Sequence, residues 1–239
     1  MSGGDVGPRE PCTGRAAARA PAVRHCGVME LRDAICARRM TRRFDADRPV
    51  PEPALAQILD HALRAPSAGM SRGWDFVVLT DPADRTAYWA VTTDDASRPE
   101  AVPDAWLRGV SAAPVLILCC SDPDTYLDRY AEPDKGWTDR DPARWPIPYW
   151  DVDVGMAAML MLLTAVDHGL GALFFGVPAG RHAAVRAAFA IPGGHRLVGV
   201  VALGYPLADA AGRGRPARRG SWTRGRRADA VHHGRFSRT

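Results

Sequence analysis

Residues 151–168, DVDVGMAAMLMLLTAVDH, are apolar on nearly every side over about five helical turns. A helix with this pattern is typical of a protein core or a subunit interface. Gly169 follows directly, as expected where a helix ends. The apolar part, residues 154–166, is too short for a membrane span and is flanked by Asp153 and Asp167. The stretch therefore predicts a central buried helix around which the remaining elements pack.

Short apolar runs on both sides of this helix predict the strands of a buried sheet. They are residues 74–80, 115–120, 172–177 and 196–204. Helical patterns cover residues 29–39, a segment with Pro53 in its first turn that stops before Pro66, parts of 85–110, and 181–190. Residues 121–150 are polar, Pro-rich and aromatic, and predict a long loop that either covers the site as a lid or is fastened by aromatic packing. Strands separated by helices predict a sheet covered by helices on both faces.

The two ends of the chain differ in composition from the middle. Residues 1–28 lack the apolar segment of a secretory signal and predict a disordered leader, and residues 208–239 carry nine arginines against two aspartates. The cysteines show no C-x-x-C pair and the histidines show no metal spacing, so we expect no metal site and a reducing, cytoplasmic setting. The cysteines are Cys12, Cys26, Cys36, Cys119 and Cys120.

Two segments carry candidate binding chemistry. Residues 38–44, RRMTRRF, place four arginines at a helix end, where guanidinium groups could grip a phosphate or simply be solvated. Residues 65–79, APSAGMSRGWDFVVL, join a helix to a strand through small residues that let backbone approach a flat ligand, or that merely turn the chain. The glycines of residues 169–176, GLGALFFG, follow a helix and precede a strand, which excludes a Rossmann fingerprint.

Taken together and in this order, RRMTRRF, LRAPSAGMSRGWDFVVL, GLGALFFG and a strand ending in ALGYP resemble the flavin-dependent nitroreductase superfamily. The resemblance covers residues 29–205, with a weaker match in the tail. It implies an α+β fold with a central, mainly antiparallel sheet flanked by helices, in an intertwined homodimer. It also implies an FMN-binding domain over residues 29–207 and a basic C-terminal extension over 208–239 that could wrap onto the partner subunit.

The resemblance further implies which residues hold the FMN phosphate and ribityl chain. Met40 stands where serine is usual in the family, so one hydroxyl contact is lost. The basic pair of the tail would return to the phosphate. The residues assigned to this end of the cofactor are Arg38, Arg39, Met40, Arg42, Arg224 and Arg226.

A second group is implied around the isoalloxazine ring, part of it on the partner subunit's flavin. Met70 stands where asparagine is frequent and Arg72 where glutamine is frequent, and Arg72 could stabilise negative charge on the reduced ring. Phe175 and Gly176 would line the face and the N5 side of the flavin. The residues assigned to the ring are Pro66, Ser67, Ala68, Met70, Arg72, Phe175 and Gly176.

The activity implied is that of an FMN-dependent oxidoreductase, which moves electrons from NADH or NADPH through flavin N5 to a small electron-poor acceptor such as a nitroaromatic, quinone or enone. No side chain is assigned as an essential acid or base. One alternative is an oxygen-using enzyme of the same superfamily, either a natural-product oxidase or one that consumes flavin to form 5,6-dimethylbenzimidazole. A second alternative is a nucleic-acid-binding protein with a degenerate flavin site, which the acidic middle of the chain disfavours.

Overall fold

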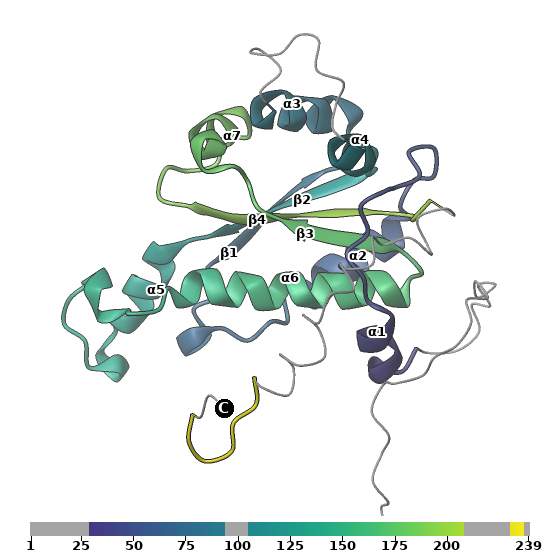
Figure 1. Cartoon of the computed structure of the whole chain (residues 1–239). Helices are drawn as coiled ribbons and strands as arrows, with labels where there is room; N and C mark the ends of the chain where they lie inside the picture. The colour runs from purple at the N-terminus through teal and green to yellow at the C-terminus, as the bar shows by residue number, and fades with distance from the viewer. Residues whose placement is uncertain (1–28, 94–104, 208–229, 237–239) are drawn as a thin grey trace, which may run out of the picture.

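A four-stranded sheet lies at the centre of the computed structural model, which describes residues 29–93, 105–207 and 230–236 (Figure 1). Its strands are β1 (Trp74–Leu79), β2 (Val115–Ser121), β3 (Gly171–Phe175) and β4 (Arg196–Gly204). They lie in the order β1-β2-β4-β3, and every neighbouring pair is antiparallel. This confirms the predicted α+β class with a mainly antiparallel sheet.

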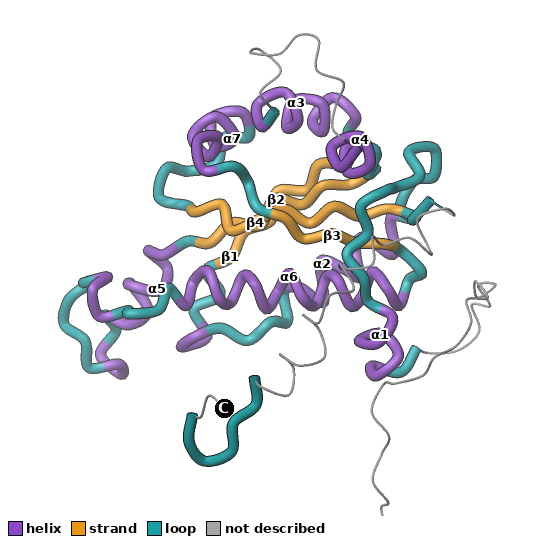
Figure 2. Tube along the Cα trace, viewed as in Figure 1, coloured by secondary structure: helices purple, strands orange, loops and turns teal. Residues whose placement is uncertain are grey.

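Helices cover both faces of the sheet (Figure 2). The long helix α6 (Tyr149–Asp167) and α2 (Glu52–Ala62) pack on one face. On the other face lie α3 (Pro82–Thr92), α4 (Ala105–Ser111) and α7 (His182–Ala188). Two shorter helices flank α6: α1 (Leu31–Ala37) at its C-terminal end and α5 (Pro123–Tyr130) at its N-terminal end (Figure 1). The predicted helical coverage of both faces is confirmed.

Strand β2 shows why the sheet sits at the centre of the core. All its side chains are buried, because alternate residues of a strand point to opposite faces and here both faces are apolar. One set packs toward α2 and α6, and the other toward α3, α4 and α7. The first set is Val115, Ile117 and Cys119, and the second is Leu116, Leu118 and Cys120.

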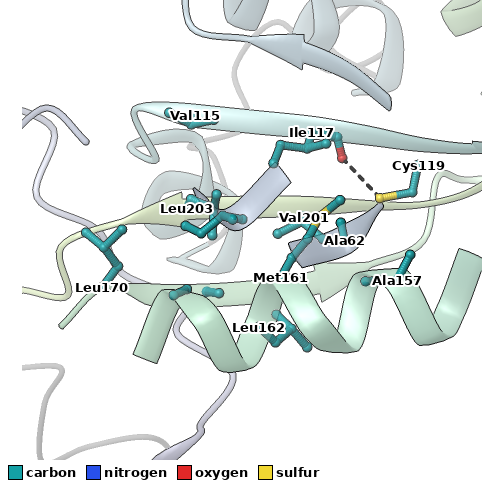
Figure 3. Packing of buried hydrophobic residues seen from close by; sticks show 14 of the residues in the cluster. Ala62, Val115, Ile117, Cys119, Ala157, Met161, Leu162, Leu170, Val201 and Leu203 are labelled. Atoms are coloured by element: carbon teal, nitrogen blue, oxygen red, sulfur yellow. Dashed lines mark hydrogen bonds between the residues drawn. The ribbon is translucent and has the colours of Figure 1, made fainter. Parts of the chain in front are cut away.

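The contact between α6 and the sheet is closely packed (Figure 3). Ala157, Met161 and Leu162 of α6 lie in one buried cluster with Val201 and Leu203 of β4. Among the described helices, α6 is the one that is long and apolar enough to cross a membrane, and half of its apolar window is buried inside the fold. The packing of α6 on the sheet accounts for the apolar residues on its buried side.

One sequence prediction was wrong. Residues 121–150 are not a continuous loop, since they contain α5 and two short 3-10 turns, η3 (Pro133–Lys135) and η4 (Pro142–Arg144). Helix α5 begins after Asp122, whose side chain accepts a hydrogen bond from the backbone N–H of Asp124, with Pro123 at the first helical position. This is a standard helix start, hidden in the sequence by the polar composition of the helix.

Candidate functional site

The arginine-rich segment of residues 38–44 runs directly past the start of β3. The Thr41 N–H donates to the Ala172 carbonyl over 2.9 Å, and Met40 forms a parallel bridge with Ala172. Gly171 permits this close approach, because a Cβ atom there would lie 2.5 Å from Thr41 Oγ1. The Phe44 side chain is buried in the core and anchors the other end of the segment. The backbone that carries the arginines is therefore firmly attached to the sheet.

Arg38, Arg39 and Arg42, the arginines of this segment that are assigned to the cofactor phosphate, have no acidic partner in the described part of the chain. Arg38 is half-buried, and its Nη1 atom is buried without a hydrogen-bond partner among the described residues. Arg39 and Arg42 are exposed, and among the described residues Arg42 donates to the Met40 carbonyl alone, over 3.3 Å. A buried guanidinium nitrogen without a partner is costly, so these side chains fit a bound anion such as the FMN phosphate.

The loop of residues 66–72 has an unusual backbone. It includes the 3-10 turn η1 (Ala68–Met70), and Gly69, Met70 and Arg72 have φ angles of 62°, 56° and 57°. A left-handed conformation costs a non-glycine residue about 1–2 kcal/mol and persists where surrounding contacts enforce it. Met70 is 76% exposed and Arg72 is exposed. The strained backbone thus presents these two side chains outward.

Hydrogen bonds inside the loop support this shape. The Ser67 hydroxyl accepts from the Arg72 N–H over 3.0 Å, and the Ser71 hydroxyl donates to the Ala68 carbonyl over 2.7 Å. These bonds close the loop into a compact turn beside the N-terminal end of α6, where the Ala68 N–H donates to Asp153 Oδ2 over 2.8 Å. Pro66, at the start of the loop, is exposed.

Phe175 and Gly176 lie at the end of the edge strand β3. The Phe175 ring is stacked with Trp89 at a centroid distance of 5.9 Å, and Trp106 meets it edge-on at 5.7 Å. Its side chain is partly buried and packs against the cluster under α3 and α4. Gly176 is exposed, and a Cβ atom there would meet nothing within 4 Å. The backbone at Gly176 is open to a ligand.

Within one chain, the loop 66–72 and the segment 38–44 lie at opposite ends of α6 (Figure 1). The loop is bonded to Asp153, near the start of the helix, whereas Thr41 is bonded to Ala172, just beyond its end. At a rise of about 1.5 Å per residue, the part of α6 from Asp153 to Asp167 is about 21 Å long. A single chain therefore does not bring the two halves of the predicted site together.

Comparison with known proteins matches residues 35–205 to the model of the nitroreductase family. The chain belongs to this family of oxidoreductases. The matched range contains all the assigned site residues except the two arginines of the tail. The match confirms the family predicted from the sequence motifs. Those two residues, Arg224 and Arg226, lie outside the described part of the structure, as do residues 1–28 and most of 208–239.

Several relatives of this nitroreductase-family chain are informative. It is 31% identical over 198 residues to a protein of Thermus thermophilus named NADH dehydrogenase, covering 75% of this chain and 88% of the relative. It is 31% identical over 183 residues to a Methanothermobacter thermautotrophicus protein assigned as an NADH dehydrogenase/NAD(P)H nitroreductase, covering 74% and 78%. A crystal structure from Exiguobacterium sibiricum, assigned as a nitroreductase in complex with FMN, shares the fold with a TM-score of 0.60 at 17% identity, covering 75% of this chain and 89% of that one.

The aromatic residues before α6 pack mainly on one another. Trp145 lies at the centre of this group. Its ring centroid is 4.6 Å from that of Tyr130, 5.5 Å from that of Trp137 and 5.8 Å from that of Trp150. This arrangement favours the second of the two roles predicted for residues 121–150, which is that aromatic packing fastens this stretch to the body of the protein.

Within residues 29–93, 105–207 and 230–236, no group of three His, Cys, Asp or Glu side chains could hold a metal ion.

Three residues beside the loop 66–72 were missed by sequence reasoning. They are Asp153 on α6 and Tyr126 and Arg129 on α5, all of which contact the loop or its anchor. Asp153 stands out in the sequence only as an acidic residue in an apolar helix. Its contact with Ala68 joins positions 85 residues apart, which no local pattern reveals.

Proposed function

We propose that this nitroreductase-family chain is an FMN-dependent oxidoreductase that passes electrons from NADH or NADPH to a small electron-poor acceptor, such as a nitroaromatic, quinone or enone. When bound, FMN supplies the electron-transfer chemistry at its ring. The chain supplies Arg38, Arg39 and Arg42 for the phosphate, with Met40 between them. The loop 66–72 and residues 175–176 supply the surroundings of the ring. The family match and the FMN-bound structural neighbour support this assignment.

The observation that carries the proposal is the buried Arg38 Nη1 atom, which has no hydrogen-bond partner in the described part of the chain, on a backbone attached to β3. Charge-assisted hydrogen bonds to phosphate would satisfy this atom and the neighbouring exposed guanidinium groups. A basic turn that is merely solvated would keep all of its guanidinium nitrogens in contact with water. The burial of Arg38 therefore favours the anion-binding interpretation over the solvated one.

We further propose that the working unit is a homodimer in which each site draws on both copies. The outward face of α6 exposes Val152, Met156 and Met159, which lie one helical turn apart. A second copy packed on this stripe in antiparallel orientation would put the partner's loop 66–72 beside this chain's arginine segment. A two-fold interface of this kind uses the same patch on both subunits. The intertwined arrangement and the cytoplasmic location stay predictions.

Titration with FMN tests the cofactor assignment. Purified protein is freed of flavin and titrated with FMN, with flavin fluorescence as the readout. Arg38→Met is expected to weaken binding at least tenfold, because it removes a charge-assisted contact. Arg64→Met is the matched control, since Arg64 is an exposed arginine whose ion-pair partner in the described structure is Asp60 on α2. Equal FMN affinity of the Arg38 variant and the wild type would contradict the phosphate assignment.

Mixed dimers test the shared site. One variant carries Arg38→Met together with Arg42→Met, and a differently tagged one carries Met70→Asp together with Arg72→Asp. A dimer with one chain of each kind has one site with both defects and one intact site. We expect each homodimer to lose FMN and the mixed dimer to regain about one FMN per two chains. Mixed dimers that bind no FMN would contradict a site built from both copies.

The acceptor class is tested by steady-state assays under nitrogen and in air. Turnover of nitroaromatics, quinones or enones under nitrogen supports the reductase assignment. Activity that requires oxygen and ignores these acceptors would favour the oxygen-using alternative. Salt-sensitive binding of nucleic acid without FMN binding would favour the remaining alternative.

A further inference from the structure

We infer that Asp153 and Arg129 are positioning residues that hold the loop 66–72 in the left-handed conformation with which it meets the flavin. This inference rests on the proposed function, because the loop is assigned to the flavin ring there. The segment of residues 122–150, which contains α5, η3 and η4 and is called the excursion below, then supports the loop from behind, and this support is called its buttress role.

Asp153 anchors the start of the loop from inside the core. Its side chain is 1% exposed, and a single oxygen, Oδ2, accepts two hydrogen bonds of 2.8 Å from the Ala68 N–H and the Tyr126 hydroxyl. A buried carboxylate is costly unless donors surround it, so this carboxylate holds both of its partners in place. Burial and the neighbouring Asp153 raise the pKa of Tyr126, which keeps the hydroxyl protonated as a donor.

Arg129 grips the centre of the loop from α5. Its Nε atom donates to the Gly69 carbonyl over 3.1 Å. Its Nη1 atom contacts Asp134 at 2.7 Å and Glu132 at 2.8 Å, and its side chain is 21% exposed. The two carboxylates orient the guanidinium group, so the bond to Gly69 is made by a side chain that is already held in position.

Tyr130 forms a wall behind the same residue. A Cβ atom at Gly69 would lie 2.7 Å from Tyr130 Cε2, so the ring leaves room for glycine alone. Tyr130 is in turn packed against Trp137 at a centroid distance of 4.9 Å and against Trp145 at 4.6 Å. The aromatic group thus continues the support from the loop to the rest of the excursion.

These contacts explain how Met70 and Arg72 keep positive φ angles although neither is glycine. Strained backbone persists where the surroundings over-determine it. Asp153 acts before the left-handed residues, Arg129 acts at Gly69, and Ser67 accepts from the N–H of Arg72. Without the first two contacts, the loop keeps only its internal hydrogen bonds and the packing of Gly69 against Tyr130, among the contacts described here, to oppose relaxation to ordinary φ angles.

The test compares Arg129→Met with Arg140→Met. Both arginines form ion pairs within the excursion, since Arg140 contacts Asp124 and Asp128, but of the two only Arg129 bonds to the loop. The first readout is amide hydrogen exchange of residues 66–72 in flavin-free protein, which does not depend on FMN binding. We expect exchange there to rise at least tenfold in Arg129→Met, with no change in α2, and to stay at the wild-type rate in Arg140→Met.

The second readout is the FMN dissociation constant together with the visible spectrum of bound flavin. Arg129→Met is expected to raise the dissociation constant about tenfold, which corresponds to about 1.4 kcal/mol. Asp153→Ala should do the same and shift the flavin spectrum. Asp153→Asn keeps an oxygen acceptor at the same place and should restore both toward wild type. A merely structural role of Asp153 would lower stability without altering the spectrum of the flavin that remains bound.

The outcomes separate this inference from the proposed function. Unchanged loop exchange in Arg129→Met overturns the positioning role, whatever the affinity for FMN. Faster exchange with unchanged FMN affinity overturns the link between the loop conformation and flavin binding. Wild-type protein that binds no FMN refutes the proposed function and with it the flavin part of the inference, and the exchange data then decide the buttress role alone.

Discussion

Replacing Gly171 by alanine should detach the arginine segment from the sheet. The added Cβ would lie 2.5 Å from Thr41 Oγ1 and 2.9 Å from Thr41 Cβ, so the segment must move. Overpacking of this kind costs about 1–3 kcal/mol. Losing the 2.9 Å hydrogen bond from Thr41 to Ala172 adds about 0.5–1.5 kcal/mol. The free energy of unfolding should therefore fall by about 1.5–4.5 kcal/mol in total.

Urea unfolding at constant protein concentration measures this loss, and FMN titration measures its effect on the site. We expect FMN to bind at least tenfold more weakly, because Arg38 and Arg42 are carried by the displaced backbone. Gly180→Ala is the matched control, since a Cβ atom there meets nothing within 4 Å. Adding Thr41→Gly removes the side chain that clashes and should restore FMN binding. A Gly171→Ala protein with wild-type stability and FMN affinity would refute the reasoning.

Three further results are expected. Met159→Glu places a charge on the exposed stripe of α6 and should give monomers in analytical ultracentrifugation, whereas Ala187→Glu on α7 should leave the assembly unchanged; a Met159→Glu dimer would contradict the proposed interface. Gly69→Ala should lower FMN affinity at least tenfold, because φ is 62° and the new Cβ meets Tyr130, and normal binding would show that the loop relaxes freely. Burial raises the pKa of Cys120 to about 12, above its usual value of 9.0, so its thiol should resist thiol reagents at pH 8 in the folded state. Above pH 9 the thiol loses its proton only when the protein unfolds, so the free energy of unfolding should fall as pH rises from 9 toward 12. Urea titrations at several pH values check this, and a free energy of unfolding that stays constant over that range would contradict it.

Much of the fold follows from local patterns in the sequence. The apolar period of α6 and the continuous apolar run of β2 predict both elements because each is buried on nearly all sides. Helix α5 was missed because it is short and polar, and its stability depends on Tyr126 and Leu127 being buried against the body. Its start signal, an aspartate followed by proline, was present in the sequence at Asp122 and Pro123.

The site was predictable only in part. The arginines of residues 38–42 were found because charge concentrated at one turn is visible in any sequence. That the Nη1 atom of Arg38 is buried with no hydrogen-bond partner among the residues that the structure describes depends on how the segment crosses β3, which only the fold reveals. The stacking of the Phe175 ring on Trp89 likewise depends on the fold, since strand alternation does not show which neighbours each face meets.

The central claim is that this chain holds FMN and accepts electrons from a nicotinamide donor. The most direct measurement is the visible spectrum of the FMN-loaded protein during anaerobic addition of NADH and, separately, NADPH. We predict that the oxidised flavin absorption is bleached by at least one donor and returns when a quinone or nitroaromatic is added. A loaded protein whose spectrum does not change with either donor would contradict the claim.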